Sequence, residues 1–231
     1  MKTITEKKNL ETMSKAPNYN KWIFNNIKPY IGKEILEIGG GIGNMTKFFI
    51  NQKLVVSTDI AEYNINKLKT NFKSRNNFFP IKTDISKTTS ALKMFSFDTV
   101  ICINVLEHIK NDFAALKNMN SILNKKGKLI IMVPAFTLLY GTIDKADSHY
   151  RRYNKKAIFK KIKKSGFKII KCVYMNIPGF FGWYYHNRMI KAELHPEEDI
   201  SFFDKIVPFF AFFEKIFKPP FGLSLIIIAE K

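Results

Sequence analysis

Residues 34–45 read EILEIGGGIGNM, a short apolar strand that runs directly into a loop with glycines at alternate positions. These glycines are Gly39, Gly41 and Gly43. Glycine is needed where the backbone turns with positive φ or approaches a ligand closely. In an open parallel sheet, the crevice after the first strand is where a nucleotide-like ligand binds. The stretch therefore predicts an α/β fold with a ligand held against this loop.

The spacing of the glycines argues against a dinucleotide. The fingerprint for such cofactors is G-x-G-x-x-G, and in this chain Asn44 and Thr46 stand where its third glycine would be. Glu37 comes just before the loop, and its negative charge would repel a pyrophosphate but attract a sulfonium or an amine. A dehydrogenase is therefore disfavoured, and a cationic ligand is favoured.

Outward from the loop, short apolar runs alternate with stretches of helical periodicity. This alternation predicts βαβ units and a mostly parallel sheet that helices cover on both faces. The length of 231 residues indicates one α/β domain. We expect strands at 34–38, 54–58, 78–81, 99–103, 128–133, 167–174 and 223–229, and helices at 19–30, 44–50, 61–72 and 112–123.

Two segments stand outside that alternation. Residues 1–15 are polar and mixed in charge, and we expect a flexible tail there, with the folded domain over 16–231. Residues 176–222 form a helical insertion rich in aromatic residues, in which Pro208 predicts two short helices instead of one long one. Two roles stay open for the insertion: a helix that walls the substrate pocket, or a basic, Phe-rich surface that rests on a membrane or a lipid-like substrate.

Acidic residues follow the second and third expected strands. Asp59 ends the second strand, twenty residues after Gly39, where a carboxylate accepts both hydroxyls of an adenosine ribose. Asp84 follows the third strand, and its reach suits the exocyclic amine of adenine, with Ile85 beside it to contact the ring. Each acid alone could simply cap a helix. Together with Glu37 and the glycine loop, they indicate an adenosine-containing ligand.

These segments resemble the class I S-adenosylmethionine-dependent methyltransferases, in the branch that includes the ubiquinone-type O-methyltransferases. The matching stretches between residues 35 and 134 are ILEIGGGIGNMTKF, VVSTDI, IKTDI, FDTVICINVLEHIKND and LNKKGKLIIMVP. The resemblance implies a Rossmann-like, doubly wound sheet of seven mostly parallel strands, the last of them antiparallel, in a methyltransferase domain over 16–231. It implies S-adenosyl-L-methionine as cofactor and S-adenosyl-L-homocysteine as product. The chain departs from the family at Gly40, where Cys or Ala is common.

The resemblance also assigns residues around the cofactor. Glu37 and the loop glycines would hold the methionine part, and Asn104, at the end of the fourth strand, would line it. Tyr19, on an N-terminal helix, would pack over the cofactor. The complete expected set is Tyr19, Glu37, Gly39, Gly41, Gly43, Asp59, Ile60, Asp84, Ile85 and Asn104.

Polar side chains gather in residues 139–154, LYGTIDKADSHYRRYN, just beyond the fifth expected strand and on the ligand-facing edge of such a sheet. We hypothesise that His149 is a general base or substrate ligand oriented by Asp144, because methyl transfer to a weak nucleophile requires removal of a proton. The stretch resembles a loop of a subset of these methyltransferases in which glycine usually precedes the histidine. Ser148 stands in that place in this chain.

Other residues complete the expected acceptor side. Arg151 and Arg152 could clamp a carboxylate or phosphate of the substrate. Alternatively, they could brace the loop together with Asp144, while Asn154 caps the next helix; both roles stay open. His108, in the segment LEHIKND that the family commonly shows, is either a catalytic or a packing residue. The candidate catalytic residues are thus His149, Asp144 and His108, and the candidate substrate residues are Tyr140, Arg151, Arg152 and Trp183.

Several other chemistries are disfavoured. The histidines show no metal-ligand spacing with Cys or acidic residues, so we expect no metal site. Cys102 and Cys172 sit in apolar runs and are expected to be buried thiols of a reducing compartment. The adenine-N and cytosine-C5 routes of nucleobase methylation are disfavoured, because no Pro-Pro-aromatic turn follows Asn104 and no proline precedes Cys102.

The charge of the chain leaves the acceptor open. The chain has 38 Lys and Arg against 19 Asp and Glu, a formal net charge of +19, but only four of the cations are Arg. Nucleic-acid readers favour Arg for bidentate contacts, so a nucleic-acid partner is disfavoured. We expect transfer of a methyl group to an O or N atom of a small or lipid-like molecule. The alternatives are an RNA or protein methyltransferase, and a non-catalytic methyltransferase-like binding subunit.

The sequence also bears on location. The first residues lack the apolar region of a signal peptide, and no apolar run approaches the ~20 residues that a spanning helix needs. We expect a cytoplasmic protein, with peripheral membrane contact as an open alternative. The clustered aromatic residues could equally form a dimer interface, so the sequence gives no oligomeric state.

Overall fold

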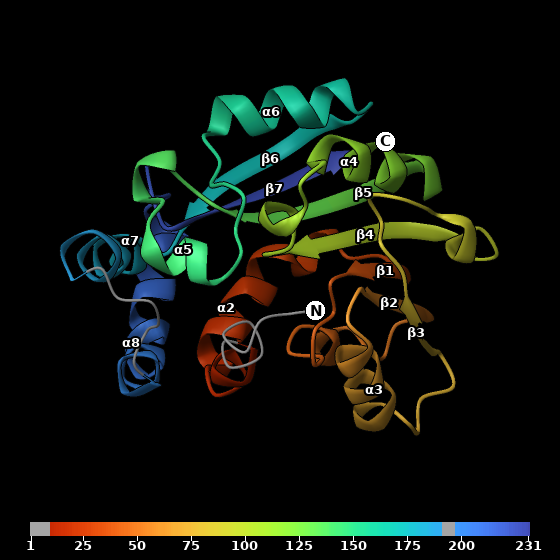
Figure 1. Ribbon diagram of the computed structural model, residues 1–231, viewed down its shortest axis with the longest axis horizontal. Coiled ribbons are helices and arrows are strands. Elements are labelled where there is room, and N and C mark those ends of the chain that lie inside the picture. Colours follow the sequence, from red (N-terminus) through yellow and green to blue (C-terminus); the bar gives the residue numbers. More distant parts are fainter. Residues whose placement is uncertain (1–9, 191–196) are drawn as a thin grey trace.

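The computed structural model describes residues 10–190 and 197–231, and its centre is one seven-stranded sheet (Figure 1). The strand order is β3-β2-β1-β4-β5-β7-β6. Neighbouring strands pair in parallel except β7, which is antiparallel to both β5 and β6. The expected Rossmann-like sheet with an antiparallel last strand is therefore confirmed. The strands are β1 Glu34–Ile38, β2 Leu54–Asp59, β3 Phe78–Lys82, β4 Phe97–Ile103, β5 Leu123–Pro134, β6 Lys168–Met175 and β7 Ser224–Glu230.

Helices cover both faces of this sheet (Figure 1). Besides the helical residues 10–14, the described α-helices are α2 Pro17–Ile27, α3 Glu62–Asn71, α4 Asp112–Ile122, α5 Thr142–Ala146, α6 Lys155–Lys164, α7 Ile177–Tyr184 and α8 Glu197–Ile216. Successive residues of a strand point to opposite faces, so Leu36 joins the core under α4 and α6 while Ile35 joins the core under α2 and α3. The two cores fix the sheet, and the sheet positions the loops at its carboxyl edge.

The segment after the glycine loop differs from expectation, and the helix predicted at 44–50 is wrong. Only a three-residue 3-10 turn, Thr46–Phe48, forms there. The Thr46 hydroxyl donates to Glu37 at 2.6 Å, and Phe49 is buried in the core. This segment is therefore held by contacts with the sheet, and not by a continuous set of helical hydrogen bonds.

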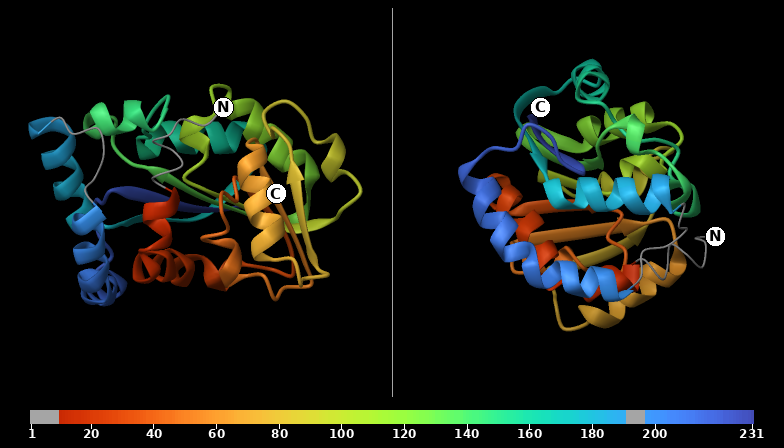
Figure 2. Two further views of the ribbon diagram at one scale, coloured as in Figure 1. Left: turned by 60° about the horizontal axis from the view of Figure 1, so that its bottom comes forward. Right: turned by 90° about the vertical axis from the view of Figure 1, so that its left-hand side faces the viewer.

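The aromatic insertion at 176–222 lies at one end of the molecule (Figure 2). It forms α7, a π-helical turn over Tyr185–Met189, and α8. Residues 191–196 of the insertion lie outside the described part of the chain. α7 begins directly after the carboxyl end of β6, and α8 packs against α2.

The two short helices expected around Pro208 are wrong, because α8 continues through this residue. A proline has no N–H to donate to the carbonyl four residues earlier, which here belongs to Asp204. That carbonyl instead accepts a hydrogen bond from Asn18 Nδ2 at 3.0 Å. Packing against α2 thus replaces the hydrogen bond that proline removes.

Two carboxylates of α8 hold neighbouring helices by their N-termini. The Asp204 carboxylate accepts from the backbone N–H groups of Asn18 at 3.2 Å and Tyr19 at 2.8 Å, in the first turn of α2. The Glu214 carboxylate accepts from Asn176 at 3.0 Å and Ile177 at 2.7 Å, at the start of α7. Unpaired N–H groups and the helix dipole both favour a carboxylate there. The two residues therefore fix α8 against α2 and α7.

The N-terminal segment is only partly described. Residues 1–9 of the expected tail lie outside the described residues, whereas residues 10–14 are helical. Asn44 Nδ2 donates to the carbonyl of Leu10 at 3.0 Å, so this part of the segment packs beside the glycine loop. Among the described residues, no helix has both the length and the apolar character needed to cross a membrane.

Candidate active site

Four strands end in residues with a left-handed backbone, and all four ends lie at the carboxyl edge of the sheet. Gly39 follows β1 with φ of 72°, Asn104 follows β4 with 51°, Phe136 follows β5 with 59°, and Asn176 follows β6 with 72°. Residues other than glycine adopt this conformation rarely and at a cost, and such strain gathers at functional sites. In open α/β sheets the carboxyl edge is also where ligands bind. These observations place the candidate site there.

The glycine loop has the backbone that the sequence predicts. Gly39, Gly41 and Gly43 have φ of 72°, 58° and 95°. A Cβ atom on Gly39 would lie 2.3 Å from Val105 Cγ2, and one on Gly43 would lie 2.6 Å from Phe72 Cε2. Both the conformation and the space therefore require glycine. The glycines thus allow the loop to pack closely against Val105 and Phe72.

Asp59 joins the glycine loop to β2 and α3. Its Oδ2 accepts from the Gly41 N–H at 3.1 Å and from Asn64 Nδ2 at 2.9 Å, and its Oδ1 accepts from the Ala61 N–H at 2.9 Å. The carboxylate is buried at the junction of these elements. The next residue, Ile60, is 62% exposed. Three hydrogen bonds within the protein thus fix this carboxylate beside an exposed apolar side chain.

Glu37 lies beneath the loop. Thr46 Oγ1 and Ser57 Oγ each donate to its Oε2 at 2.6 Å. Burial raises the pKa of this carboxyl to about 7, against the lowering effect of those two hydrogen bonds. A Cβ on Gly40 would lie 2.0 Å from Ser57 Oγ, so glycine at this position makes room for the hydroxyl. The loop thus rests on a hydrogen-bonded carboxyl.

Two residues expected at the cofactor are buried among other side chains. The side chain of Ile85 is buried in the core between the sheet and α4, so the expected ring contact is not supported by its position. Tyr19 is buried with its ring edge-on to Trp22 and tilted against Phe203 of α8. Tyr19 packs between α2 and α8, and its hydroxyl is hydrogen-bonded to Asn176 and Ser224, at the end of β6 and the start of β7.

Asp84 and Asn104 remain at the edge. Asp84 Oδ1 accepts from the Ser86 N–H at 3.0 Å and from its hydroxyl at 2.6 Å, and Lys87 lies 3.5 Å from Oδ2. The carboxylate therefore holds its own turn, whatever else it binds. Asn104 is exposed after β4, and its N–H donates to the Met132 carbonyl at 2.9 Å, so its strained backbone is tied to β5.

Asp144 is the centre of the acceptor side. Its Oδ1 lies 2.9 Å from His149 Nδ1 and accepts from Arg152 Nε at 2.7 Å. Its Oδ2 accepts from Asn187 Nδ2 at 3.0 Å and from the Gly141 N–H at 3.1 Å. The carboxylate is fully buried. The expected pairing of Asp144 with His149 is found, and Asn187 of the insertion is a partner that sequence reasoning did not find.

These contacts set the protonation of the pair. Burial alone would raise the pKa of Asp144, but the hydrogen bond from His149 and the charge of Arg152 outweigh it, and the pKa is lowered. Burial alone would lower the pKa of His149, but the bond to Asp144 and the charge of Glu107 outweigh it, and the pKa is raised. Asp144 is therefore an anion that holds Nδ1–H, which leaves Nε2 to take or give a proton.

Glu107 was missed by the sequence analysis. Its side chain is buried, and its Oε2 has no hydrogen-bond partner among the described residues. Burial raises the pKa of this carboxyl to about 7, with the charge of His149 acting against the rise. The only sequence signal was its place next to His108 in the LEHIKND segment. Glu107 adds a second titratable group close to His149.

His108 completes a cluster with these groups. Its ring lies edge-on to the ring of His149 with centroids 4.6 Å apart. One ligand atom from each of Glu107, His108 and His149 lies within 4.8 Å of the others. Imidazole and carboxylate donors suit divalent cations, so the expectation of no metal site, which rested on spacing along the chain, overlooked this juxtaposition.

The two arginines have partners within the protein. Arg151 pairs with Asp112 at 2.8 Å and donates to the Lys110 carbonyl at 2.9 Å. Arg152 is buried, paired with Asp144, and its guanidinium carbon lies 4.4 Å from the centroid of the Trp183 ring. Of the two roles left open, the contacts support bracing of the loop.

Two neighbouring side chains add to the same brace. Tyr140, expected at the substrate, donates its hydroxyl to the His149 carbonyl at 2.8 Å. Asn154 stands before α6, but its side chain does not cap that helix and instead accepts from the Thr137 N–H at 3.4 Å. The loop that carries His149 is therefore held at both ends.

The comparisons with known proteins concern the family and the fold. The family model described as "Methyltransferase domain" matches residues 8–171. An uncharacterized protein of Methanocaldococcus jannaschii is 31% identical over 150 residues, covering 64% of this chain and 59% of that protein. A tRNA U34 carboxymethyltransferase of Psychrobacter is 22% identical over 189 residues, covering 69% of this chain and 54% of that protein. The chain thus spans little more than half the length of these relatives.

Among solved structures, the fold is similar to an S-adenosylmethionine-dependent methyltransferase of Archaeoglobus fulgidus. The TM-score is 0.61 at 18% identity, and the match covers 93% of this chain and 94% of that one. At this identity the likeness concerns the fold alone.

Proposed function

This chain belongs to the class I S-adenosylmethionine-dependent methyltransferases, and from that premise we propose that it methylates an oxygen or nitrogen atom of a small or lipid-like acceptor, with His149 as the general base. The observation that carries the proposal is the Asp144–His149 pair at the carboxyl edge. A histidine whose Nδ1–H is held by a buried carboxylate presents Nε2 as a base.

The residues at the glycine loop fit S-adenosylmethionine. The positive-φ turn at Gly39 and Gly41 offers a ligand backbone that carries no side chain of its own, and the fixed carboxylate of Asp59 suits the two ribose hydroxyls. When bound, the cofactor supplies a methyl group activated by a sulfonium. We also propose that Glu37, Asp84 and Asn104 contact the cofactor.

On the acceptor side, the chain's own residues handle a proton. His149 Nε2 would take the proton of an acceptor hydroxyl, while Asp144 keeps the imidazole in the required tautomer. Arg152 and Trp183 pack around Asp144 and exclude water from its carboxylate. A hydroxyl needs such a base, whereas an amine that is already neutral needs little help, so the site supports an O-acceptor best.

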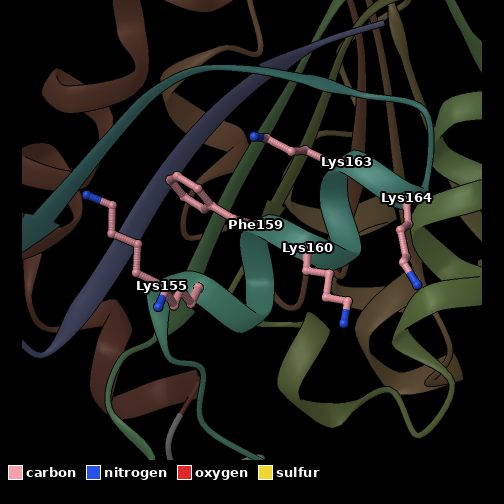
Figure 3. Close-up of a pocket in the computed structure, with 6 residues that line it drawn as sticks. Lys155, Phe159, Lys160, Lys163 and Lys164 are labelled. Carbon is pink, nitrogen blue, oxygen red and sulfur yellow. The ribbon is translucent and has the colours of Figure 1, made fainter.

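A second candidate function rests on a basic surface. On α6, Lys155, Lys160 and Lys163 stand with other lysines around Phe159, at a surface hollow of about 550 Å³ (Figure 3). Lysines bind phosphate backbones without reading sequence, and one relative is named as a tRNA-modifying enzyme. RNA bound along α6 would approach the loop of His149, because α6 begins where that loop ends.

One experiment separates these acceptors. The purified chain is incubated with methyl-labelled S-adenosylmethionine and cell extract, which is then separated into lipid, small-molecule, RNA and protein fractions. Label in the lipid or small-molecule fraction that falls about 10²–10⁴-fold with His149→Ala supports the proposal. Label in RNA that falls with Lys160→Gln/Lys163→Gln favours the second candidate. Absence of label from every fraction, with cofactor binding intact, contradicts both.

A further inference from the structure

We propose that the outer face of α8 docks on a membrane surface that carries anionic lipid headgroups. The face is a stripe of exposed aromatic and aliphatic side chains bordered by lysines. The inference goes beyond the methylation reaction and does not rest on it, because its readout is attachment to vesicles without any substrate.

The stripe follows the helical repeat. Its members recur at spacings of three, four and seven residues, so they share one side of α8. The exposed fractions of these side chains run from 42% to 69%. Single apolar residues are ordinary on a protein surface, but a continuous stripe of them is not. The stripe consists of Phe202, Phe209, Phe212, Phe213, Ile216 and Phe217.

The exposed side of α8 is not a core-facing side that α8 has failed to bury. The opposite side is already committed: Val207 is buried, Phe203 packs on Tyr19, and Asp204 and Glu214 cap α2 and α7. The helix cannot rotate to bury the stripe without breaking these contacts. The chain therefore holds a Phe-rich surface outward on a fixed helix.

The charged residues of α8 indicate what binds to its exposed face. Lys205 lies within the stripe, and Lys215 and Lys218 follow at its end, all three exposed. α8 begins with the acidic residues Glu197, Glu198 and Asp199, so the basic character lies at its other end, where Lys215 and Lys218 flank the phenylalanines. The two further acids of the helix, Asp204 and Glu214, turn inward to the helix N-termini. Phenylalanines beside lysines, on a chain with a formal net charge of +19, match an anionic bilayer surface.

The neighbouring helix continues the surface. α7 and α8 stand at the same end of the molecule (Figure 2), and Phe181, Tyr184 and Tyr185 of the α7 segment are each exposed by 44% or more. Tyrosine is favoured at the boundary between lipid and water. The same end holds Asn187 and Trp183, which contact Asp144, so the docked face adjoins the acceptor side.

The test is sedimentation with vesicles of phosphatidylcholine alone and of phosphatidylcholine mixed with phosphatidylglycerol. The full chain should bind the mixed vesicles more tightly, and binding should weaken as salt is raised. The variant Phe209→Gln/Phe212→Gln/Phe217→Gln should lose binding, and Lys205→Gln/Lys215→Gln/Lys218→Gln should weaken it on the order of tenfold or more. The substituted positions are exposed and glutamine is a good helix former, so we expect the variants to keep the fold. A melting curve checks this.

Matched controls make the result specific. Lys155→Gln/Lys160→Gln/Lys163→Gln removes the same charge from α6, and Met94→Gln removes an exposed apolar side chain between β3 and β4. Both should bind vesicles as the unmodified chain does. Failure of the unmodified chain to bind, or equal weakening by the α6 variant, overturns the proposal. A dimer in solution that the phenylalanine variant dissolves also overturns it, since the face would then be a protein interface.

Discussion

Ser148 is the residue through which the loop turns into His149. Its φ is 60°, a left-handed conformation that costs most residues about 1 kcal/mol and costs glycine little. Ser148→Gly is therefore expected to stabilise the chain by about 0.5–1 kcal/mol. Chemical denaturation measures the change. Ser148→Ala, which removes the hydroxyl but keeps Cβ, should give no such gain, and an equal gain would show that the hydroxyl and not the backbone was responsible.

Glu107 gives a pH dependence of stability. Its pKa in the fold, about 7, lies above the ordinary value of 4.5 because of burial. A carboxyl with a raised pKa holds its proton more tightly when folded, so its contribution is complete below pH 4.5 and is lost as pH rises through 7. Glu107→Gln should match the unmodified chain near pH 5 and exceed its stability at pH 8 by about 2–3 kcal/mol. Parallel curves for the two chains across that range would contradict the argument.

His149 gives a pH dependence of rate. The base must be neutral to accept a proton, and the contacts with Asp144 and Glu107 raise its pKa against the effect of burial. The rate of methyl transfer should rise with pH through a value above the ordinary pKa of 6.5. Asp144→Asn should move this rise to lower pH and lower the plateau about 10²–10⁴-fold. An unchanged profile in the variant would exclude His149 as the titrating base.

At the scale of elements, α8 acts as a clamp. Asp204 caps the first turn of α2 from a distance of 185 residues along the chain, in place of a local cap. Asp204→Ala leaves two N–H groups unpaired at a partly buried helix end and should cost about 1–3 kcal/mol in the free energy of unfolding. Denaturation curves test this, with the exposed neighbour change Lys205→Ala as control. Equal stability of both variants would show that α2 does not depend on this cap.

The elements also show what sequence patterns could predict. The strands were found because each is a short apolar run bounded by polar loops, as in β1 and β2. The long α8 was missed because proline normally ends a helix, and only the carbonyl of Asp204 paired with Asn18 explains why this one continues. Contacts from elsewhere in the fold also explain why the helix predicted at 44–50 is wrong. The tertiary contacts of Thr46 and Phe49 prevail there over the helical periodicity of the sequence.

At the scale of the whole molecule, the two sides of the site differed in how far they could be predicted. The glycine turn is local, so residues 34–45 sufficed to predict its backbone. The acceptor side is assembled from β4, the loop after β5 and the insertion, so the neighbours of Asp144 such as Asn187 and the buried Glu107 could not follow from spacing along the chain. The packing of Tyr19 and Ile85 in the two cores likewise depends on the complete fold.

The central claim is that two functions lie at separate places along one edge of the sheet. The cofactor binds at Asp59 and the glycine loop, and His149 removes the proton. Calorimetric titration with S-adenosylmethionine tests it on the unmodified chain, Asp59→Asn and His149→Gln. We predict that Asp59→Asn weakens binding by about 10–100-fold, through loss of charge-assisted hydrogen bonds, and that His149→Gln binds as the unmodified chain does. Equal binding by all three chains, or loss of binding with His149→Gln alone, would contradict the account.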